Sequence, residues 1–389
     1  SDYASLDNFD PEDKDSFVNI KERSYLDKWI LSRMTTVAEN YHENFVSWDF
    51  HKAGRELENF VINDLSNWYV RRSRRRLWNE DQSNDKRSCQ HTLHEVLLTV
   101  CRLMAPVSPF IPDQIHRDLT GHSVHLADWP VGSNLVERTL PPQNWVLEQE
   151  MALVRKLAET GRRVRVEAGR RQRLPCKSGW IVGGPDISEF HEILAEELNV
   201  ESLTTEEDLD RFQKIEIAPN RKSLGKKCRQ DLPAVLELLE NADPDNILLE
   251  IEAEICILEG YDITMEDIEI KRVEKENFAA ATISIEEIGD VSLVLDMSLN
   301  EELISKGLAR DIIRHVQAKR KEINLDVEAL IELNVWIEPN ELLFDNDWSH
   351  IQIETRAGNA GINQGDIPEE IGYFEVDGIE VNFSVKEIN

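Results

Sequence analysis

The stretch that decides the fold is Asp64-Leu-Ser-Asn-Trp-Tyr-Val-Arg-Arg-Ser-Arg-Arg-Arg-Leu-Trp-Asn-Glu80. Five arginines and three aromatic residues lie within eleven of its positions, although the chain of 389 residues has a formal net charge of -31. Neither Gly nor Pro interrupts residues 55–80. Apolar residues recur there at helical spacing, at Leu57, Val61, Leu65 and Trp68. The stretch is therefore predicted to continue an amphipathic helix, and its arginines to bind a carboxylate or a polyanion.

The charge of the chain is unevenly distributed. Residues 21–180 contain 25 Lys or Arg against 20 Asp or Glu, whereas the remainder contains 19 against 55. One mildly basic segment is thus flanked by strongly acidic ones. This asymmetry bears on the partners and the solubility of the protein rather than on its fold.

The composition argues against several classes of protein. No run of eighteen apolar residues occurs, so no membrane-spanning helix is predicted. Residues 1–15 are acidic and lack the basic and apolar parts of a signal peptide. The five cysteines are far apart and include no C-x-x-C pair, so neither a disulfide framework nor a metal site is predicted. We expect a cytoplasmic protein, with neither membrane nor DNA as a partner.

Helices are expected over most of residues 23–170. Ser24 is a suitable N-cap for the first helix, with Asp27 at the N3 position. The other helices are expected at about 47–80, 88–104, 113–119 and 144–166. Three prolines within 106–112 forbid one continuous helix there. Together these segments predict an all-α antiparallel bundle.

The remaining residues are expected to mix helices with strands. Residues 1–22 are predicted to be a connector, 171–215 a small α/β connecting segment, and 216–389 an α+β domain. Within the last of these, a helix is expected over 223–240. Ile or Leu alternates with Glu over 247–258, which predicts a half-buried strand.

No catalytic residue is predicted. The sequence contains none of the motifs G-x-x-x-x-G-K-[ST], G-x-G-x-x-G, G-x-S-x-G or H-E-x-x-H. Paired carboxylates carry no information in so acidic a chain.

On a regular helix, the arginines of the cluster divide between two faces. Arg71 and Arg74 share a face with Trp78, and with Arg76 they are predicted to contact RNA phosphates and unpaired bases. Such an interface combines forked guanidinium donors with stacking surfaces.

The second face carries Arg72 and Arg75. These side chains extend the buried stripe and are predicted to form structural ion pairs, with Asp64 or with another helix. For the cluster as a whole, a merely salt-bridged helix is the alternative to RNA binding.

The quoted stretch resembles the signature helix of the anticodon-binding domain in the isoleucyl, valyl and leucyl group of class I aminoacyl-tRNA synthetases. Three further pieces resemble the same family, in its order and with plausible spacing. They are Tyr25-Leu-Asp-Lys-Trp-Ile-Leu-Ser-Arg33, Leu103-Met-Ala-Pro-Val-Ser-Pro-Phe-Ile-Pro112 and Ser123-Val-His-Leu-Ala-Asp-Trp-Pro130.

The C-terminal half resembles the archaeal and eukaryotic type of isoleucyl enzyme. The resemblance rests on Glu196-Glu-Leu-Asn-Val200, Leu293-Val-Leu-Asp296 and the segment 301–322. The coiled coil in which valyl enzymes usually end is absent, as is the cysteine zinc site of bacterial isoleucyl enzymes.

The resemblance implies that catalysis and tRNA recognition belong to different domains of the parent enzyme. The family's His-x-Gly-His and Lys-Met-Ser-Lys-Ser signatures are missing, so the catalytic core and editing domain would lie before Ser1. ATP and Mg would serve the parent enzyme, and this part would need no cofactor. Its partners would be tRNA(Ile) and the catalytic core of the same synthetase. The residues expected to bind tRNA are Trp68, Tyr69, Arg71, Arg74, Arg76, Trp78, Arg162, Arg163, Arg170 and Arg171.

Two alternatives stay open at this point. The chain could be the anticodon-binding part of a valyl or leucyl enzyme. It could also be a structural or protein-interaction segment whose arginines pair within the chain and bind no RNA.

Overall fold

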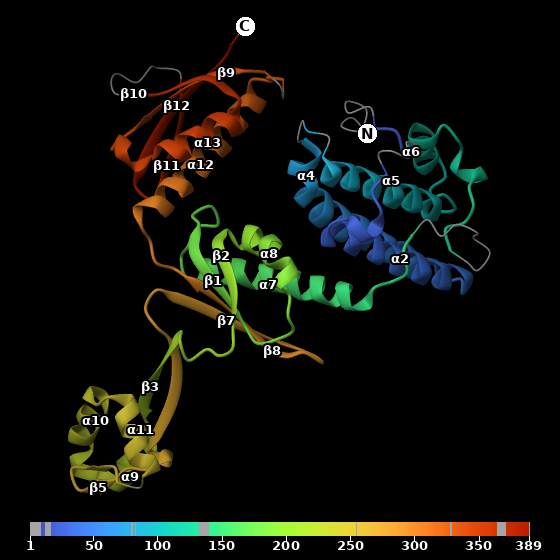
Figure 1. Ribbon diagram of the computed structural model, residues 1–389. Coiled ribbons are helices and arrows are strands. Elements are labelled where there is room, and N and C mark those ends of the chain that lie inside the picture. Colours follow the sequence, from blue (N-terminus) through green and yellow to red (C-terminus); the bar gives the residue numbers. More distant parts are fainter. Residues whose placement is uncertain are drawn as a thin grey trace. The chain divides into compact units, whose positions relative to one another are not determined.

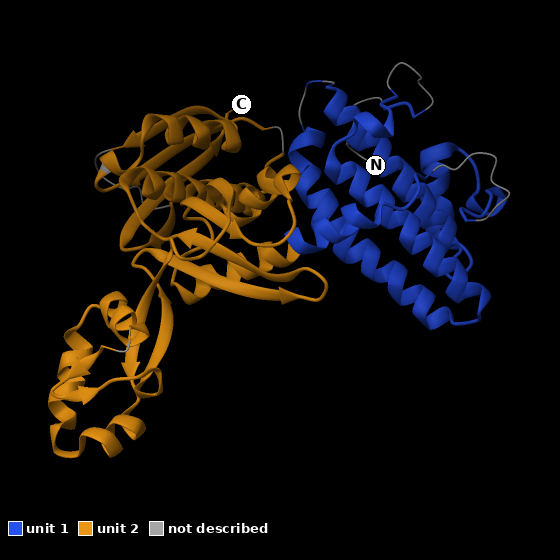
Figure 2. Ribbon diagram, turned by 60° about the horizontal axis from the view of Figure 1, so that its bottom comes forward, with its two compact units in different colours: residues 1–154 blue, residues 155–389 orange. Residues whose placement is uncertain are grey.

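A computed structural model describes residues 9–11, 17–78, 81, 83–131, 140–253, 255–326, 329–363 and 371–388. The chain divides into two compact units, residues 1–154 and residues 155–389 (Figure 2). Much of the connector predicted over 1–22 lies outside the described residues. Within the described ranges, no helix has the length and apolar character needed to cross a membrane.

The first unit is helical, as predicted (Figure 1). Its elements are η1 (Ile20–Glu22), α2 (Tyr25–Val46), α3 (Phe50–Asn59), η2 (Phe60–Val70), α4 (Arg71–Trp78), α5 (Asn84–Met104), α6 (Phe110–Thr120), η3 (Val124–Leu126) and the start of α7 (Trp145–Glu167). The predicted cap of α2 is confirmed, because Ser24 Oγ accepts a hydrogen bond from the backbone N–H of Asp27 at 3.2 Å. Helix α2 packs against α3, η2 and α5.

The helix that contains the arginine cluster is not regular. It runs through α3, η2 and α4, and η2 is a π-helix of 11 residues. A π-helix bonds residue i to i+5 and so has more residues in each turn than an α-helix. Its buried side chains are accordingly spaced by four and five positions, at Phe60, Asp64, Leu65, Trp68 and Tyr69. The stripe then continues at Ser73 of α4.

The second unit contains a four-stranded sheet in the order β2-β1-β8-β7. Its strands are β1 (Cys176–Val182), β2 (Val200–Glu206), β7 (Phe278–Ile285) and β8 (Gly289–Asp296). Strands β1 and β2 are parallel and are joined through η4 (Ser188–Phe190) and α8 (His191–Leu198), while the other pairs are antiparallel. Gly161 of α7 lies so close to this unit's helix and sheet that a Cβ would clash with Leu198 of α8 and would lie 2.9 Å from the side chain of Leu293 on β8.

A second sheet has the order β10-β9-β12-β11. It consists of β9 (Ile331–Ile337), β10 (Ala357–Asn363), β11 (Gly372–Val376) and β12 (Ile379–Glu387), with α12 (Glu301–Glu322) and α13 (Asp345–Thr355) packed against it. The core is formed by one face of α12, including Leu308 and Ile312, against the inward side of β9. These layers confirm the predicted α+β region.

The segment 213–274, called the small lobe below, has a hydrophobic core of its own around Leu224, Val235, Ile247 and Ile251. Its longest strands are β3 (Gln213–Pro219) and β6 (Ile268–Glu274), which pair antiparallel. Its other elements are α9 (Arg221–Cys228), η5 (Arg229–Asp231), α10 (Leu232–Asn241), α11 (Pro244–Glu252), β4 (Ile257–Leu258), β5 (Tyr261–Asp262) and η6 (Met265–Asp267).

Two sequence-based predictions fail in this lobe. The helix predicted over 223–240 is broken at Arg229, whose φ of 46° is incompatible with a continuing helix. The strand predicted over 247–258 is wrong, since residues 244–252 form α11. Asp243 caps that helix and Pro244 occupies its first turn, while Ile247 and Ile251 lie one helical turn apart in the core. The prediction fails because a short run of alternating apolar residues is compatible with both the two-residue period of a strand and the 3.6-residue period of a helix.

The buried side chain of Asp267 connects α9 to the turn at Thr264 within the small lobe. Its carboxylate is 2% exposed and accepts hydrogen bonds from Ser223 Oγ at 2.6 Å, Lys227 Nζ at 2.8 Å and the backbone N–H of Thr264 at 3.1 Å. Burial by itself raises the pKa of this carboxyl, but the hydrogen bonds outweigh it and lower the pKa from 3.8 to about 2.

This lowered pKa predicts how the lobe responds to acid. A carboxyl with a lower pKa in the folded state stabilises the fold above its unfolded pKa, near 4, and loses this effect as the pH falls through about 2. We expect Asp267→Asn to lower the free energy of unfolding by about 2 kcal/mol at pH 6, and the deficit to shrink toward pH 2. Thermal unfolding at a series of pH values measures this. A loss of free energy of unfolding that does not depend on pH would contradict this prediction. An equal loss in the exposed control variant Asp262→Asn would contradict it as well.

Candidate nucleic-acid interface

Helix α4 carries the exposed part of the arginine cluster. Arg71, Arg74 and Arg75 are all exposed. Arg71 Nε donates to the carbonyl oxygen of Asn67 at 2.9 Å, and its guanidinium lies 5.8 Å from the ring centroid of Trp68. Within the described ranges, neither Arg74 nor Arg75 takes part in an ion pair. The end of the helix therefore presents forked donors to solvent.

Arg76 has a different environment. Its Nη1 and Nη2 donate to the two carboxylate oxygens of Asp27 at 2.9 and 2.7 Å, and its Nε donates to Asp85 at 2.8 Å. Asp27 is fully buried and also accepts from the hydroxyl of Tyr69 at 2.5 Å. Burial lowers the pKa of Arg76, but its hydrogen bonds with Asp27 and the charge of that carboxylate raise the pKa above its ordinary value. Arg76 thus joins α4 to α2 and to the start of α5.

The environments of two arginines differ from the predicted division between two faces. Arg76, predicted to face RNA, is a structural partner of Asp27, whereas Arg75, predicted to form structural pairs, is exposed. Asp64, one of the partners predicted for Arg72 and Arg75, pairs with Arg33 at 3.3 Å. The prediction assumes α-helical spacing throughout, and the extra residues in each turn of η2 rotate every side chain beyond it.

The aromatic residues of the stretch are also divided. Trp68 and Tyr69 are 5% and 0% exposed, and burial raises the pKa of the Tyr69 hydroxyl well above its usual value. Trp78, at the end of α4, is 56% exposed. Only an exposed ring has a face available to a base. We therefore leave Trp68, Tyr69 and Arg76 out of the candidate interface, and define that interface by Arg71, Arg74, Arg75 and Trp78.

The second basic run is largely engaged within the second unit. Arg162 pairs with Glu197 at 3.1 Å, Arg163 lies 3.9 Å from Glu167, Arg170 donates to the Met297 carbonyl, and Arg171 pairs with Asp311 and Asp377 at 2.5 and 2.6 Å. Arg165, at the centre of the run, is fully buried and donates to the carbonyls of Arg171, Leu174 and Asn199. These hydrogen bonds hold the chain between α7 and β1, so the run has a structural role irrespective of any RNA contact.

Two exposed cations near this run were missed by the sequence analysis. Arg310 and Arg314 lie one turn apart on α12, and Arg310 Nη1 donates to the carbonyl of Arg173 at 3.4 Å. The i, i+4 spacing is visible in the sequence. The contact of Arg310 with Arg173, which is far away along the chain, cannot be read from the sequence.

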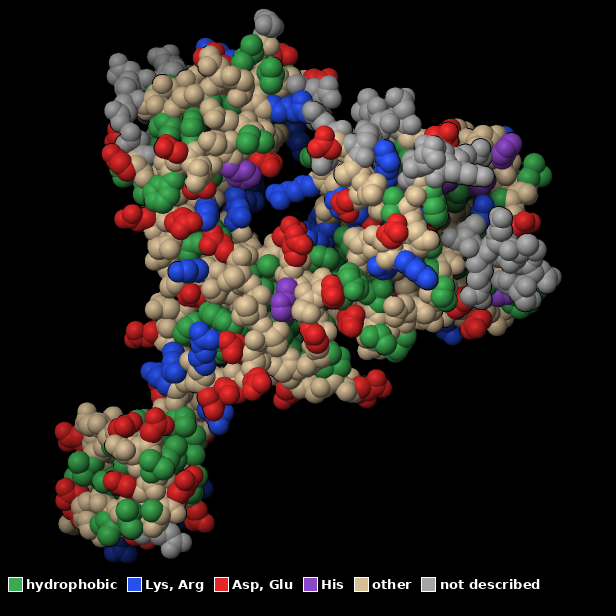
Figure 3. All heavy atoms as spheres, in the orientation of Figure 1, with side chains coloured by type: hydrophobic (Ala, Val, Ile, Leu, Met, Phe, Trp, Pro, Cys, Tyr) green, Lys and Arg blue, Asp and Glu red, His purple; other side chains and the backbone are tan. Residues whose placement is uncertain are grey.

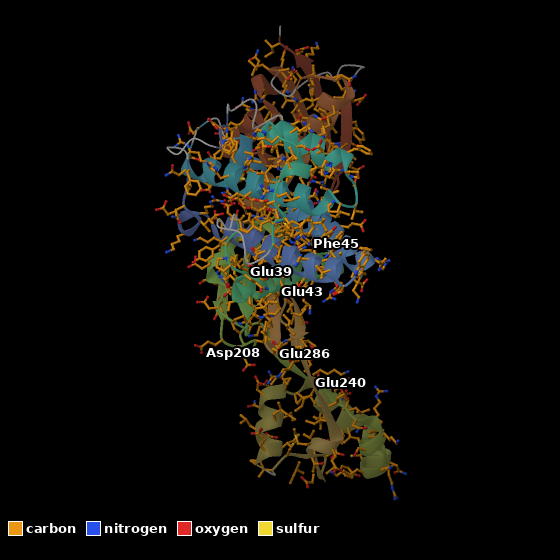
Figure 4. All side chains as sticks on the ribbon, turned by 90° about the vertical axis from the view of Figure 1, so that its right-hand side faces the viewer. Glu39, Glu43, Phe45, Asp208, Glu240 and Glu286 are labelled. Atoms are coloured by element: carbon orange, nitrogen blue, oxygen red, sulfur yellow. The ribbon has the colours of Figure 1, made fainter. Side chains whose placement is uncertain are left out.

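Two acidic side chains lie on α2 far from α4. Glu39 and Glu43 are exposed on the C-terminal half of α2, near Phe45 (Figure 4). Asp27, the partner of Arg76, lies at the other end of the same helix, about 24 Å from Glu43 at 1.5 Å per residue.

No metal site emerges from the part of the chain that the structure describes. No group of three or more His, Cys, Asp or Glu side chains there is arranged to hold a metal ion. All five cysteines are free and buried.

Comparison with known proteins agrees with this geometry. Residues 27–178 match the family model described as the anticodon-binding domain of tRNA ligase. The chain therefore contains an anticodon-binding domain of the tRNA ligase type.

The particular relatives are isoleucine--tRNA ligases. That of Bacillus thuringiensis is 33% identical over 85% of this chain and 31% of the relative. That of Methanocaldococcus jannaschii is 32% identical over 86% and 31%. That of Methanothrix thermoacetophila is 30% identical over 98% and 37%. Most of the chain is thus homologous to isoleucine--tRNA ligases, both bacterial and archaeal, and it spans about a third of their length.

Proposed function

We propose that the first unit binds the anticodon arm of tRNA(Ile) through the α4 end of its helical bundle, as the tRNA-recognition part of an isoleucine--tRNA ligase. The observation that carries the proposal is the exposed set Arg71, Arg74, Arg75 and Trp78 on a domain of the anticodon-binding type. ATP-dependent activation of isoleucine would belong to a catalytic core of the same ligase, and we expect it to act in the cytoplasm.

The chemistry of the interface suits the unpaired nucleotides of a loop. Guanidinium groups bind phosphates through paired donors and stack on bases, and the exposed indole of Trp78 offers a further stacking face. Arg33 and Arg76 would act as positioning residues, because their ion pairs hold η2 and α4 against α2.

Removing the exposed arginines should weaken RNA binding without unfolding the domain. For the triple variant Arg71→Gln, Arg74→Gln, Arg75→Gln, we expect the affinity for a tRNA(Ile) transcript to fall at least about tenfold. The slope of log affinity against log salt should fall by up to about 3, roughly one unit for each phosphate that the variant no longer neutralises. Fluorescence titrations between 50 and 200 mM salt, with wild-type and anticodon-altered transcripts, measure both quantities.

A matched control keeps the same change of net charge. Lys52→Gln, Arg55→Gln, Arg117→Gln removes three exposed cations from the same unit, on α3 and α6 rather than on α4, and should leave the affinity nearly unchanged. Wild-type protein that binds tRNA with no dependence on the anticodon would contradict the proposal. Unchanged binding with a lowered melting temperature in the α4 variant would instead favour the structural or protein-interaction alternative.

A further inference from the structure

The small lobe concentrates its positive charge on one helix. Five of the nine residues from Arg221 to Arg229 are Lys or Arg, namely Arg221, Lys222, Lys226, Lys227 and Arg229. The rest of the lobe has only Lys214, Lys271 and Arg272, against fifteen Asp or Glu in the whole lobe. The face of the lobe visible in Figure 3 accordingly carries acidic and hydrophobic side chains. Helix α9 is thus a local exception on an acidic body.

Most of these cations are available to a partner. Arg221, Lys222, Lys226 and Arg229 are exposed, and none of them has an ion pair with any residue that the structure describes. Two of the three other cations of the lobe are paired, Lys214 with Glu216 at 3.0 Å and Arg272 with Asp210 at 3.2 Å. A group of like charges held together without counter-charges is costly unless a polyanion neutralises it.

The helix also borders a polar cleft of about 640 Å³. Its lining is Asn220, Lys222, Ser223, Lys226, Lys227, Thr264, Glu266 and Asp267. Asp267 orients Lys227 at 2.8 Å while its own charge is satisfied by Ser223 and Thr264. Glu266 is the remaining acid, and it shares the cleft with the two lysines Lys222 and Lys226. The cleft is therefore net cationic and built on a buried anchor.

We propose that α9 of the small lobe binds the phosphate backbone of the same tRNA. The second unit would thereby add a contact to the one that the first unit makes; this inference rests on the proposed function. Lysine binds phosphate as a point charge, without demands on base identity. Protein interfaces are depleted in lysine and enriched in aromatic residues, so an exposed lysine cluster fits a nucleic acid better than a protein partner. The contact would add affinity and orientation, whereas base recognition stays with the first unit.

The test compares two triple variants of the full chain with the same change of charge on the same lobe. Arg221→Gln, Lys222→Gln, Lys226→Gln removes the cluster, and Lys214→Gln, Lys271→Gln, Arg272→Gln removes cations from β3 and β6. The first should weaken binding of tRNA(Ile) about tenfold at 100 mM salt and lower the salt slope by about 2 to 3. The second should change the affinity less than about twofold.

The anticodon distinguishes the two proposals. Because phosphate contacts carry no sequence information, the α9 variant should weaken wild-type and anticodon-altered transcripts by the same factor. An α9 variant with unchanged affinity and salt slope, measured beside an α4 variant that no longer binds, would overturn this inference and leave the proposed function intact. Unchanged binding in both variants would overturn both.

Discussion

Replacement of Asp27 by Ala is expected to lower the free energy of unfolding of the helical unit by about 3–5 kcal/mol, because it removes the buried counter-charge of a largely buried guanidinium and leaves it only the exposed carboxylate of Asp85. Asp27 accepts both terminal nitrogens of Arg76 and the hydroxyl of the buried Tyr69, and no part of it is exposed. The substitution therefore removes three hydrogen bonds and the buried partner of Arg76 where α4 meets α2.

Chemical denaturation of the purified variants measures this effect. Arg76→Ala should be nearly as damaging, since it leaves the carboxylate of Asp27 buried with only the Tyr69 hydroxyl as a donor. The double variant should cost clearly less than the sum of the two single variants, because the partners act as one unit. Additive effects would mean that the pair is not coupled, and an effect below about 1 kcal/mol in Asp27→Ala, typical of an exposed pair, would contradict the burial.

The second large effect is expected at Glu148, near the start of α7. Its carboxylate is 6% exposed and accepts hydrogen bonds from Ser32 Oγ at 2.5 Å, Thr36 Oγ1 at 2.7 Å and Arg33 Nη1 at 3.0 Å. Burial lowers the pKa of Arg33, but the charge of Asp64 and the hydrogen bond with Glu148 raise it above its ordinary value. One carboxylate thus fastens the start of α7 to α2.

Glu148→Ala should lower the free energy of unfolding by about 3–4 kcal/mol, because two buried hydroxyls and one guanidinium lose an acceptor. Glu148→Gln retains a carbonyl acceptor and should cost about half as much. Glu159→Ala removes an exposed glutamate from the same helix and should change stability by no more than about 0.5 kcal/mol. Equal effects of Glu148→Ala and Glu159→Ala in denaturant titrations would contradict the network.

The cap at Ser24, the helical period around Leu57 and the prolines after Met104 already predict the helical bundle. Each is a local signal, because capping, amphipathic spacing and the missing N–H of proline act within one or two turns. The fold class of the α+β region can be predicted for the same reason. The motifs around the arginine cluster also lead to the right family of tRNA ligases.

The roles of the individual arginines depend on the folded chain. The π-helix η2 changes the direction of the side chains that follow it, so that Arg76 contacts Asp27 on α2 and Arg75 is exposed, and the α-helical period of the local sequence does not indicate this shift. The partners of Arg171, at Asp311 and Asp377, lie more than a hundred residues away along the chain. Sequence patterns report backbone preference and periodicity, whereas which charges are paired and which remain for RNA is decided by distances that only the tertiary fold creates.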